Sequence, residues 1–154
     1  MHKRFLLSVL LVALPAVPAA AEEAAGGPRA ELRGGVAWSG GHTDPVLGIA
    51  TGHDFDLGDH TFLGAEVSGE KILAQGAYVE LALTARLGTA VTEKGSVFVN
   101  GGYTFTHHGD APHLGLGYEH HFGHGGRYIA AEYRHTFVDH HEGNAITIGI
   151  GTFF

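Results

Sequence analysis

The last ten residues, Ala145-Ile-Thr-Ile-Gly-Ile-Gly-Thr-Phe-Phe154, alternate large apolar side chains with smaller ones. One face carries Ile146, Ile148, Ile150 and Phe154 together with Thr152. A period of two predicts a β-strand with one strongly apolar face and one small, weakly polar face. Ten residues is also about the length that a tilted strand needs to cross a bilayer, which takes roughly 9–11 residues. The stretch therefore predicts either a strand of a membrane barrel or an edge strand of a soluble sheet.

The same alternation recurs upstream, between short polar or glycine-rich breaks. We predict strands over residues 29–39, 46–57, 61–70, 77–88, 96–106, 113–122, 127–138 and 145–154. In residues 77–88 the alternation has no exception, and a helix there would place Glu80 and Arg86 among leucines. An even number of strands of about ten residues is the sequence signature of a transmembrane β-barrel.

Two kinds of eight-stranded barrel fit this pattern, and they differ in which face is inside. A soluble lipocalin-type barrel encloses its apolar face around a ligand, whereas a membrane barrel turns that face to lipid. Here the other face is mostly Gly, Ala, Thr and Ser, which is too uncharged for the outside of a soluble barrel. We therefore predict an all-β fold: a closed, eight-stranded, antiparallel up-and-down transmembrane β-barrel. A soluble periplasmic lipocalin-like ligand binder is the alternative.

Aromatic residues near the strand ends of the apolar face support the membrane alternative. They are Trp38, Tyr103, Tyr118, Tyr133, Phe137 and Phe154. Rings of this kind form girdles at both interfaces of membrane barrels.

Charged residues on the small face are predicted to point into the barrel. They are Glu31, Arg33, Glu66, Glu80, Arg86, Glu119, Glu132 and Arg134. Side chains fill the interior of eight strands, so we expect no open channel. Because an unpaired buried ion is costly, we expect Arg86 and Arg134 to be bridged by Glu80, Glu119 or Glu132. A gated ion path through this network is the alternative.

The N-terminus has the layout of a secretory signal peptide. His2-Lys3-Arg4 precedes an apolar run from Phe5 to Leu14, and Ala19-Ala20-Ala21 forms a small-residue cleavage site. We predict a signal peptide over residues 1–21, a short lead-in over 22–28 and a barrel domain over 29–154. No later apolar run is long enough for a transmembrane helix.

Composition narrows the functional classes. The chain has no cysteine, so disulfides do not stabilise it. Lys and Arg number 9 and Asp and Glu 16; without Lys3 and Arg4 the balance is 7 against 16, a charge of −9. An acidic exported chain is a poor nucleic-acid binder. The 25 glycines exceed the average share of about 7 %, and we expect them where side chains converge inside a barrel.

Several motifs in the second half resemble those of opacity-type, outer-membrane-protein-A-like barrels of Gram-negative bacteria. They are Gly101-Gly102-Tyr103, the run from Gly115 to Tyr118, Ala131-Glu132-Tyr133-Arg134-His135, and the run from Ile148 to Phe154. The resemblance implies an outer-membrane location with both termini in the periplasm. It implies lipid and lipopolysaccharide as surroundings, periplasmic chaperones and the barrel-assembly machinery as partners, and a monomer. Ile148, Ile150 and Phe154 would then form the C-terminal assembly signal.

The resemblance does not imply a single activity, since the family includes adhesins and structural barrels. With periplasmic termini, the external loops would be residues 40–44, 71–76, 107–112 and 139–144. Such short loops offer little adhesive surface. We therefore predict a structural or surface role without catalysis and without a required cofactor.

The 13 histidines are unusually many, and several are clustered. On the predicted topology His107, His108 and His113 share the outer rim with His140 and His141. Imidazole with nearby carboxylates suits zinc, copper or nickel, so a divalent metal site is one hypothesis. Adjacent histidines point apart, however, and solvated polar loops are the alternative.

A lipid A-modifying enzyme is the remaining alternative. The segment Tyr133-Arg134-His135-Thr136-Phe137 has a faint similarity to the lipid A deacylase strand, with Glu142 downstream. However, His135 falls on the apolar face, and Phe137 occupies the position where that strand has a serine. The serines Ser39, Ser68 and Ser96 have no adjacent histidine, and a nucleophile without a base is not activated.

Overall fold

A computed structural model describes residues 26–154 apart from residues 108, 139 and 140. The predicted signal peptide, residues 1–21, lies outside the described residues. Strand β1 begins at Gly27, so Gly27 and Pro28 of the expected lead-in already pair with β2. The described residues include no helix with the length and apolarity to span a membrane.

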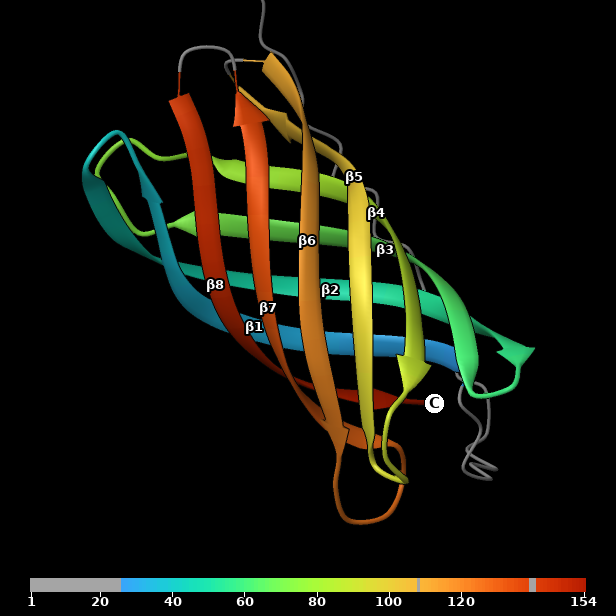
Figure 1. The fold of residues 1–154 in the computed structure, drawn as a ribbon. Helices are drawn as coiled ribbons and strands as arrows, with labels where there is room; N and C mark the ends of the chain where they lie inside the picture. Colours follow the sequence, from blue (N-terminus) through green and yellow to red (C-terminus); the bar gives the residue numbers. More distant parts are fainter. Residues whose placement is uncertain (1–25, 108, 139–140) are drawn as a thin grey trace, which may run out of the picture.

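Within the described residues, eight antiparallel strands form a closed barrel in the order β1 to β8 (Figure 1). They are β1 (Gly27–Ser39), β2 (His42–Gly58), β3 (Thr61–Ile72), β4 (Val79–Ala90), β5 (Gly95–Thr106), β6 (Gly109–His121), β7 (Arg127–Val138) and β8 (His141–Phe153). Each strand pairs with its neighbour in sequence, and β8 pairs back onto β1 from Arg29–Phe153 to Trp38–Asn144. The predicted up-and-down barrel is confirmed.

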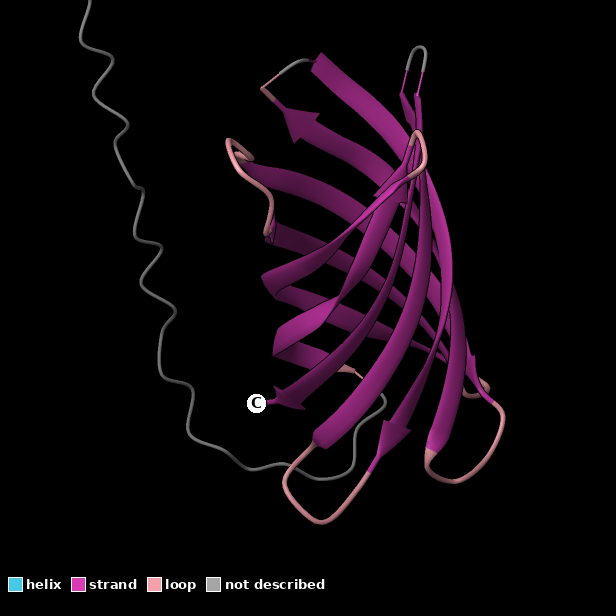
Figure 2. Ribbon diagram, turned by 90° about the vertical axis from the view of Figure 1, so that its left-hand side faces the viewer, coloured by secondary structure: helices cyan, strands magenta, loops and turns pink. Residues whose placement is uncertain are grey.

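The two rims of the barrel differ in what they carry. The start of β1 and the end of β8 lie together at one rim (Figures 1 and 2), which we call the terminal rim. It also holds the turns at residues 59–60, 91–94 and 122–126. The opposite, far rim holds the turns at residues 40–41 and 73–78, the end of β5 with the start of β6, and the end of β7 with the start of β8.

Four strands, β2, β3, β6 and β8, extend further at the far rim than the sequence pattern predicted, whereas β4 begins two residues later, at Val79. Strand β2 begins at His42, β6 at Gly109 and β8 at His141, so most of the expected loops at 40–44, 107–112 and 139–144 are paired hairpin ends. The alternation is lost in these polar segments, but their backbones still complete the ladder. Hairpins can extend beyond the apolar belt because pairing depends on the backbone, not on side-chain hydropathy.

Apolar side chains face outward around the whole barrel. Leu32 on β1, Ile49 on β2, Leu83 on β4 and Leu116 on β6 have between 55 % and 62 % of their surface exposed. Their neighbours in sequence point inward and are mostly small or charged. This is the arrangement of a membrane barrel and the reverse of a lipocalin-type barrel.

Glycines make room inside the barrel for large polar side chains. A Cβ atom on Gly64 of β3 would lie 2.1 Å from Asp54 Oδ1 and 2.6 Å from Arg86 Cγ. On β8, a Cβ on Gly149 would lie 2.3 Å from Glu31 Oε1. Such contacts are far shorter than van der Waals distance, so a methyl group at either position would have to displace a carboxylate side chain inside the barrel.

Two glycines of β3, Gly64 on its inward face and Gly69 on its outward face, test this account. Gly64→Ala should destabilise the barrel by about 1–3 kcal/mol, because the added methyl group overpacks the interior. Gly69→Ala should have little effect, because a Cβ at this outward position meets Leu81 Cδ2 at 3.5 Å, an ordinary contact. Urea unfolding in detergent micelles, followed by fluorescence of Trp38, the sole tryptophan, measures both. Equal effects of the two substitutions would contradict the packing argument.

Candidate functional site

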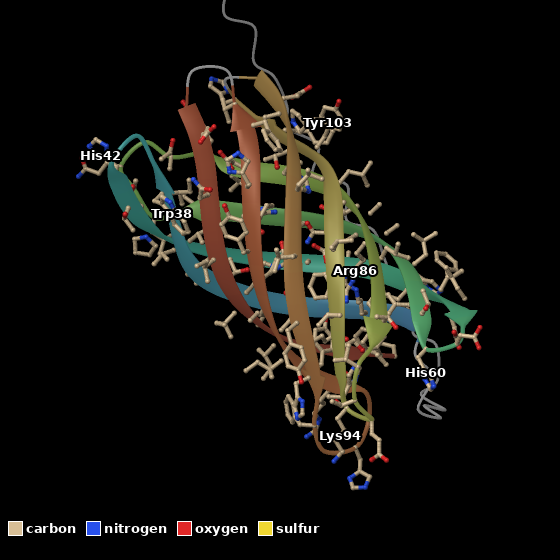
Figure 3. All side chains as sticks on the ribbon, in the orientation of Figure 1. Trp38, His42, His60, Arg86, Lys94 and Tyr103 are labelled. Carbon is tan, nitrogen blue, oxygen red and sulfur yellow. The ribbon has the colours of Figure 1, made fainter. Side chains whose placement is uncertain are left out.

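The inward-facing charged side chains form one connected cluster, which we call the ionic core. Its members are Arg29, Glu31, Arg33, Asp54, Glu66, Glu70, Arg86, Glu119, Glu132 and Arg134. Each points inward because it lies on the small face of its strand. Figure 3 shows the side chains as sticks, with Arg86 of the ionic core labelled.

Arg33 of β1 lies at the middle of the ionic core. Its Nε donates to Glu31 Oε1 at 2.9 Å, and its Nη2 donates to Glu66 Oε1 at 2.9 Å. Its Nη1 lies 3.5 Å from Glu70 Oε1 and 3.9 Å from Glu132 Oε2. The planar guanidinium presents its donors in a fixed fork, which suits this bridging of carboxylates from β1, β3 and β7.

Arg29 extends the cluster toward the terminal rim. Its Nη2 donates to Glu66, its Nε lies 3.4 Å from Asp54 Oδ1, and its Nη1 donates to the hydroxyl of Tyr128 at 3.3 Å. The side chain is fully buried. A buried guanidinium is stable only when its donors find acceptors, and here β2, β3 and β7 supply them.

Arg86 of β4 combines ion pairing with aromatic contact. Its Nη2 donates to Glu119 Oε2 at 2.9 Å and lies 3.8 Å from Asp54 Oδ2. Its guanidinium carbon lies 4.2 Å from the ring centroid of Phe98 and 4.9 Å from that of Phe62. These are cation–π distances, so the two rings stabilise the charge from the side that the carboxylates leave open.

An aromatic layer lies between the ionic core and the terminal rim. Phe62, Phe98 and Tyr128 are almost completely buried, and the ring of Phe153 lies 5.3 Å from that of Tyr128. His121 stacks on Phe153 at 5.7 Å, and its Nε2 lies 2.9 Å from Glu119 Oε1. This layer therefore fills the terminal end of the barrel with rings.

One ion pair crosses the barrel from wall to wall. Arg134 of β7 donates to Glu70 of β3. In the closed order these strands are four places apart in either direction, so they lie on opposite sides. The contact, together with the Arg33–Glu70 and Arg33–Glu132 pairs, occupies the lumen at this level.

The sequence identified many of these side chains but not their pairing. Arg33, Glu66, Arg86, Glu119, Glu132 and Arg134 all belong to the ionic core. The expected bridge between Arg86 and Arg134 is wrong, because Arg86 pairs with Glu119 and Arg134 with Glu70. The two arginines share one row across the sheet through Asn100 and Gly115. Barrel strands are tilted, however, so residues of one row lie at different heights along the axis.

Three members of the ionic core, Arg29, Asp54 and Glu70, were not among the predicted interior charges. Glu80 was predicted, but it forms no ion pair within 4.0 Å among the described residues. Arg29, Asp54 and Glu70 lie on the small face of a predicted strand or at its first residue, so the alternation contains the signal. The alternation does not indicate which side chains come close enough to pair across the lumen.

His113 does not join the loop histidines. Its ring is 1 % exposed inside the barrel, with Nε2 at 3.0 Å from Thr84 Oγ1 and Nδ1 at 3.0 Å from Thr104 Oγ1. Its place on the predicted outer rim is therefore corrected: residue 113 follows the hairpin end on the inward face of β6. No group of three potential metal ligands is found among the described side chains.

The other predicted metal ligands remain a hypothesis. His107 is exposed at the far rim and stacks on Tyr78 with ring centroids 4.4 Å apart. Both line a hollow of about 130 Å³ together with Glu80. His108 and His140 lie outside the described residues, and His141 begins β8. A metal site in these loops stays a prediction.

The predicted assembly signal lies on the lipid face of the last strand. Ile148 and Ile150 point outward with 51 % and 58 % of their surface exposed, and Phe154 follows β8 with 54 % exposed. The three apolar groups thus run from the middle of β8 to the terminal rim. Their role in assembly stays a prediction.

Solved structures of bacterial membrane barrels are similar to this chain. The N-terminal barrel domain of Pseudomonas aeruginosa OprF matches with a TM-score of 0.58 and 14 % identity, over 84 % of this chain and 99 % of that one. Neisserial surface protein A matches with a TM-score of 0.56 and 10 % identity, over 85 % and 98 %. The Yersinia pestis attachment invasion locus protein Ail matches with a TM-score of 0.56 and 13 % identity, over 83 % and 99 %.

The likeness is one of fold. No protein-family model matches this sequence, and no curated protein is similar to it. The chain has the architecture of a small transmembrane β-barrel, as its alternation and its resemblance to outer-membrane barrels implied. The narrower opacity-type assignment stays a prediction.

In the ionic core, replacing the central arginine should destabilise the barrel more than neutralising one of its carboxylates. Arg33→Met should destabilise the barrel by about 3–5 kcal/mol, because it leaves several buried carboxylates without their shared cation. Glu132→Gln should have little effect, because Arg33 keeps its closer partners Glu31 and Glu66. Urea unfolding in micelles measures both variants. A Glu132→Gln variant as unstable as Arg33→Met would contradict the central role given to Arg33.

Proposed function

We propose that this chain is a small outer-membrane β-barrel protein of a Gram-negative bacterium, with a structural or surface role of the opacity type and no open pore. A cleaved signal peptide over residues 1–21 exports it. Both termini lie in the periplasm, and the far rim faces outside. It resides in the membrane as a monomer that performs no catalysis.

The membrane location is supported by the apolar belt around the middle of the barrel. Outward-facing side chains of every strand are largely aliphatic or aromatic over the middle of the barrel. An exposed apolar surface that encircles a protein cannot remain in water, and hydrocarbon is the solvent that suits it. Solved structures with the same fold come from Neisseria, Pseudomonas and Yersinia outer-membrane and surface proteins.

The observation that carries the absence of a pore is the contact between Glu70 and Arg134. It joins opposite walls of the barrel, and the surrounding ionic core is almost fully buried. Below it the aromatic layer of Phe62, Phe98 and Tyr128 occupies the lumen again. Two successive filled levels leave water and ions no continuous path, which supports a structural role over transport.

Migration on cold and boiled gels tests the membrane location. The protein from an isolated outer-membrane fraction should migrate differently before and after boiling, because a closed barrel resists detergent until it is heated. The same protein should be absent from the soluble periplasmic fraction. A soluble periplasmic protein with no shift on boiling would overturn the proposal.

Planar-bilayer recording tests the closed lumen. Purified protein inserted into a bilayer should give no stable conductance steps, because the Glu70–Arg134 pair and the aromatic layer block the path. A general porin inserted under the same conditions is the control. Regular steps from the wild-type protein would show that the filled levels open, and the role would then be transport.

A further inference from the structure

A small polar patch interrupts the apolar outer face near the far rim. It consists of Trp38 on β1, Tyr133 and His135 on β7, and Asn144 on β8. These strands are neighbours, since Asn144 pairs with Trp38 on one side and with His135 on the other. All four side chains point outward but are only half-exposed, because they cover one another. We call them the outer polar patch.

Asn144 is the centre of the outer polar patch. Its Oδ1 accepts a hydrogen bond from the Tyr133 hydroxyl at 2.8 Å and lies 2.9 Å from His135 Nδ1. Since a carbonyl oxygen only accepts, His135 Nδ1 must carry a hydrogen and donate it. Both lone pairs of Oδ1 are then occupied, and the orientation of the amide and the tautomer of neutral His135 are fixed.

This fixed arrangement leaves a defined set of polar groups in the patch available to a ligand. The amide NH₂ of Asn144 and the indole N–H of Trp38 are donors with no acceptor among the described residues. In neutral His135, Nε2 is an acceptor. The ring of Trp38 lies 6.4 Å from that of Tyr133, tilted by 34°, so the patch also presents two neighbouring aromatic rings.

Hydrocarbon cannot satisfy these groups, whereas the hydrated headgroup layer at the rim can. Polar groups that lose water without a new hydrogen bond are costly. The patch contains no lysine or arginine, and the chain is acidic overall, with a formal charge of −7. A phosphate headgroup therefore finds no cation here. A sugar ring matches better, because its hydroxyls both donate and accept, and its apolar face packs on an aromatic ring.

We propose that the outer polar patch binds the saccharide headgroup of a glycolipid in the outer leaflet. The sugar packs on Trp38, accepts hydrogen bonds from the Asn144 amide and the Trp38 indole, and donates one to His135 Nε2. The site deepens the proposed function, because it rests on the far rim facing outside. It names the lipid headgroup that contacts the barrel at that rim.

Mixed micelles test the headgroup preference directly. The folded protein is placed in dodecylphosphocholine, and dodecyl maltoside with the same tail length replaces it in steps. Trp38 is the sole tryptophan, so its emission reports the patch without labelling. A sugar-selective site should saturate, with half of the emission change at a maltoside mole fraction well below one half. A site without preference should follow the bulk mole fraction in a straight line.

A matched tryptophan probe at the same rim, on the opposite side of the barrel from the patch, provides the control. Tyr103 of β5 also faces outward near the far rim, and β5 lies opposite β1 in the closed order (Figure 3). The double variant Trp38→Phe with Tyr103→Trp moves the sole tryptophan there. Its emission should change linearly with maltoside content. Asn144→Leu, which keeps Trp38 but removes the centre of the patch, should also turn the saturating curve into a straight line.

The outcomes separate the site from the wider proposal. A straight line from wild-type Trp38, or half of the emission change at a maltoside mole fraction well above one half, would overturn the sugar site. The wild-type curve and the Tyr103 control decide this even where Asn144→Leu fails to fold. The experiment uses micelles, so it does not depend on cellular location. A saturating curve from a protein found outside the outer membrane would overturn the location but keep the site.

Discussion

Lipid offers no hydrogen-bond partner to a backbone, and this constraint governs the whole molecule. Every N–H and C=O in the hydrocarbon layer must be paired within the protein. A sheet can meet that demand only by closing on itself, which here occurs where β8 pairs with β1. Closure fixes two surfaces with opposite requirements. The outer surface must be apolar, and the inner one must fit a narrow lumen.

The narrow lumen is filled by a few large polar side chains, and many glycines leave space for them. Arginines extend across the barrel toward carboxylates on other strands, and glycines such as Gly64 and Gly149 give them space. The buried charges do not stabilise the fold simply by being paired, since burying an ion pair is costly in itself. Their effect is on geometry: pairs such as Arg33–Glu66, Arg86–Glu119 and Arg134–Glu70 join strands that are not neighbours in the sheet. The Glu70–Arg134 contact is the longest of these links in terms of strand order.

Local alternation was enough to predict the strands, and β7 was predicted with its observed bounds, 127–138. It was enough to separate the two faces, because side chains alternate regardless of tertiary context. It failed where the pattern lapses, as at His42 and Gly109, since hairpin ends pair without an apolar face. It also failed for partners across the lumen. Those depend on strand tilt, which the sequence of one strand does not contain.

The ionic core and the outer polar patch differ in how the sequence could reveal them. Arg29 and Glu70 lie on the inward face by simple counting, so a stricter count would have included them. Asn144 was predicted to lie in a loop. Its contacts with Tyr133 and His135 depend on the additional strand residues at the start of β8, beyond the apolar belt. Polar residues in a segment without alternation give no sign of facing lipid. Only the register of three strands brings them together.

The pairing of β1 with β8 also sets the order in which the molecule can form. Arg29 meets Phe153, so the contact that completes the sheet joins residues from the two ends of the described chain. Hairpins such as β3–β4 involve only local contacts, but the seam requires almost the entire chain to be in place. Contacts with a large sequence separation slow folding. Until the seam forms, both edge strands are open to pairing with other chains. The time before the seam forms is therefore the period in which the sheet needs protection from aggregation.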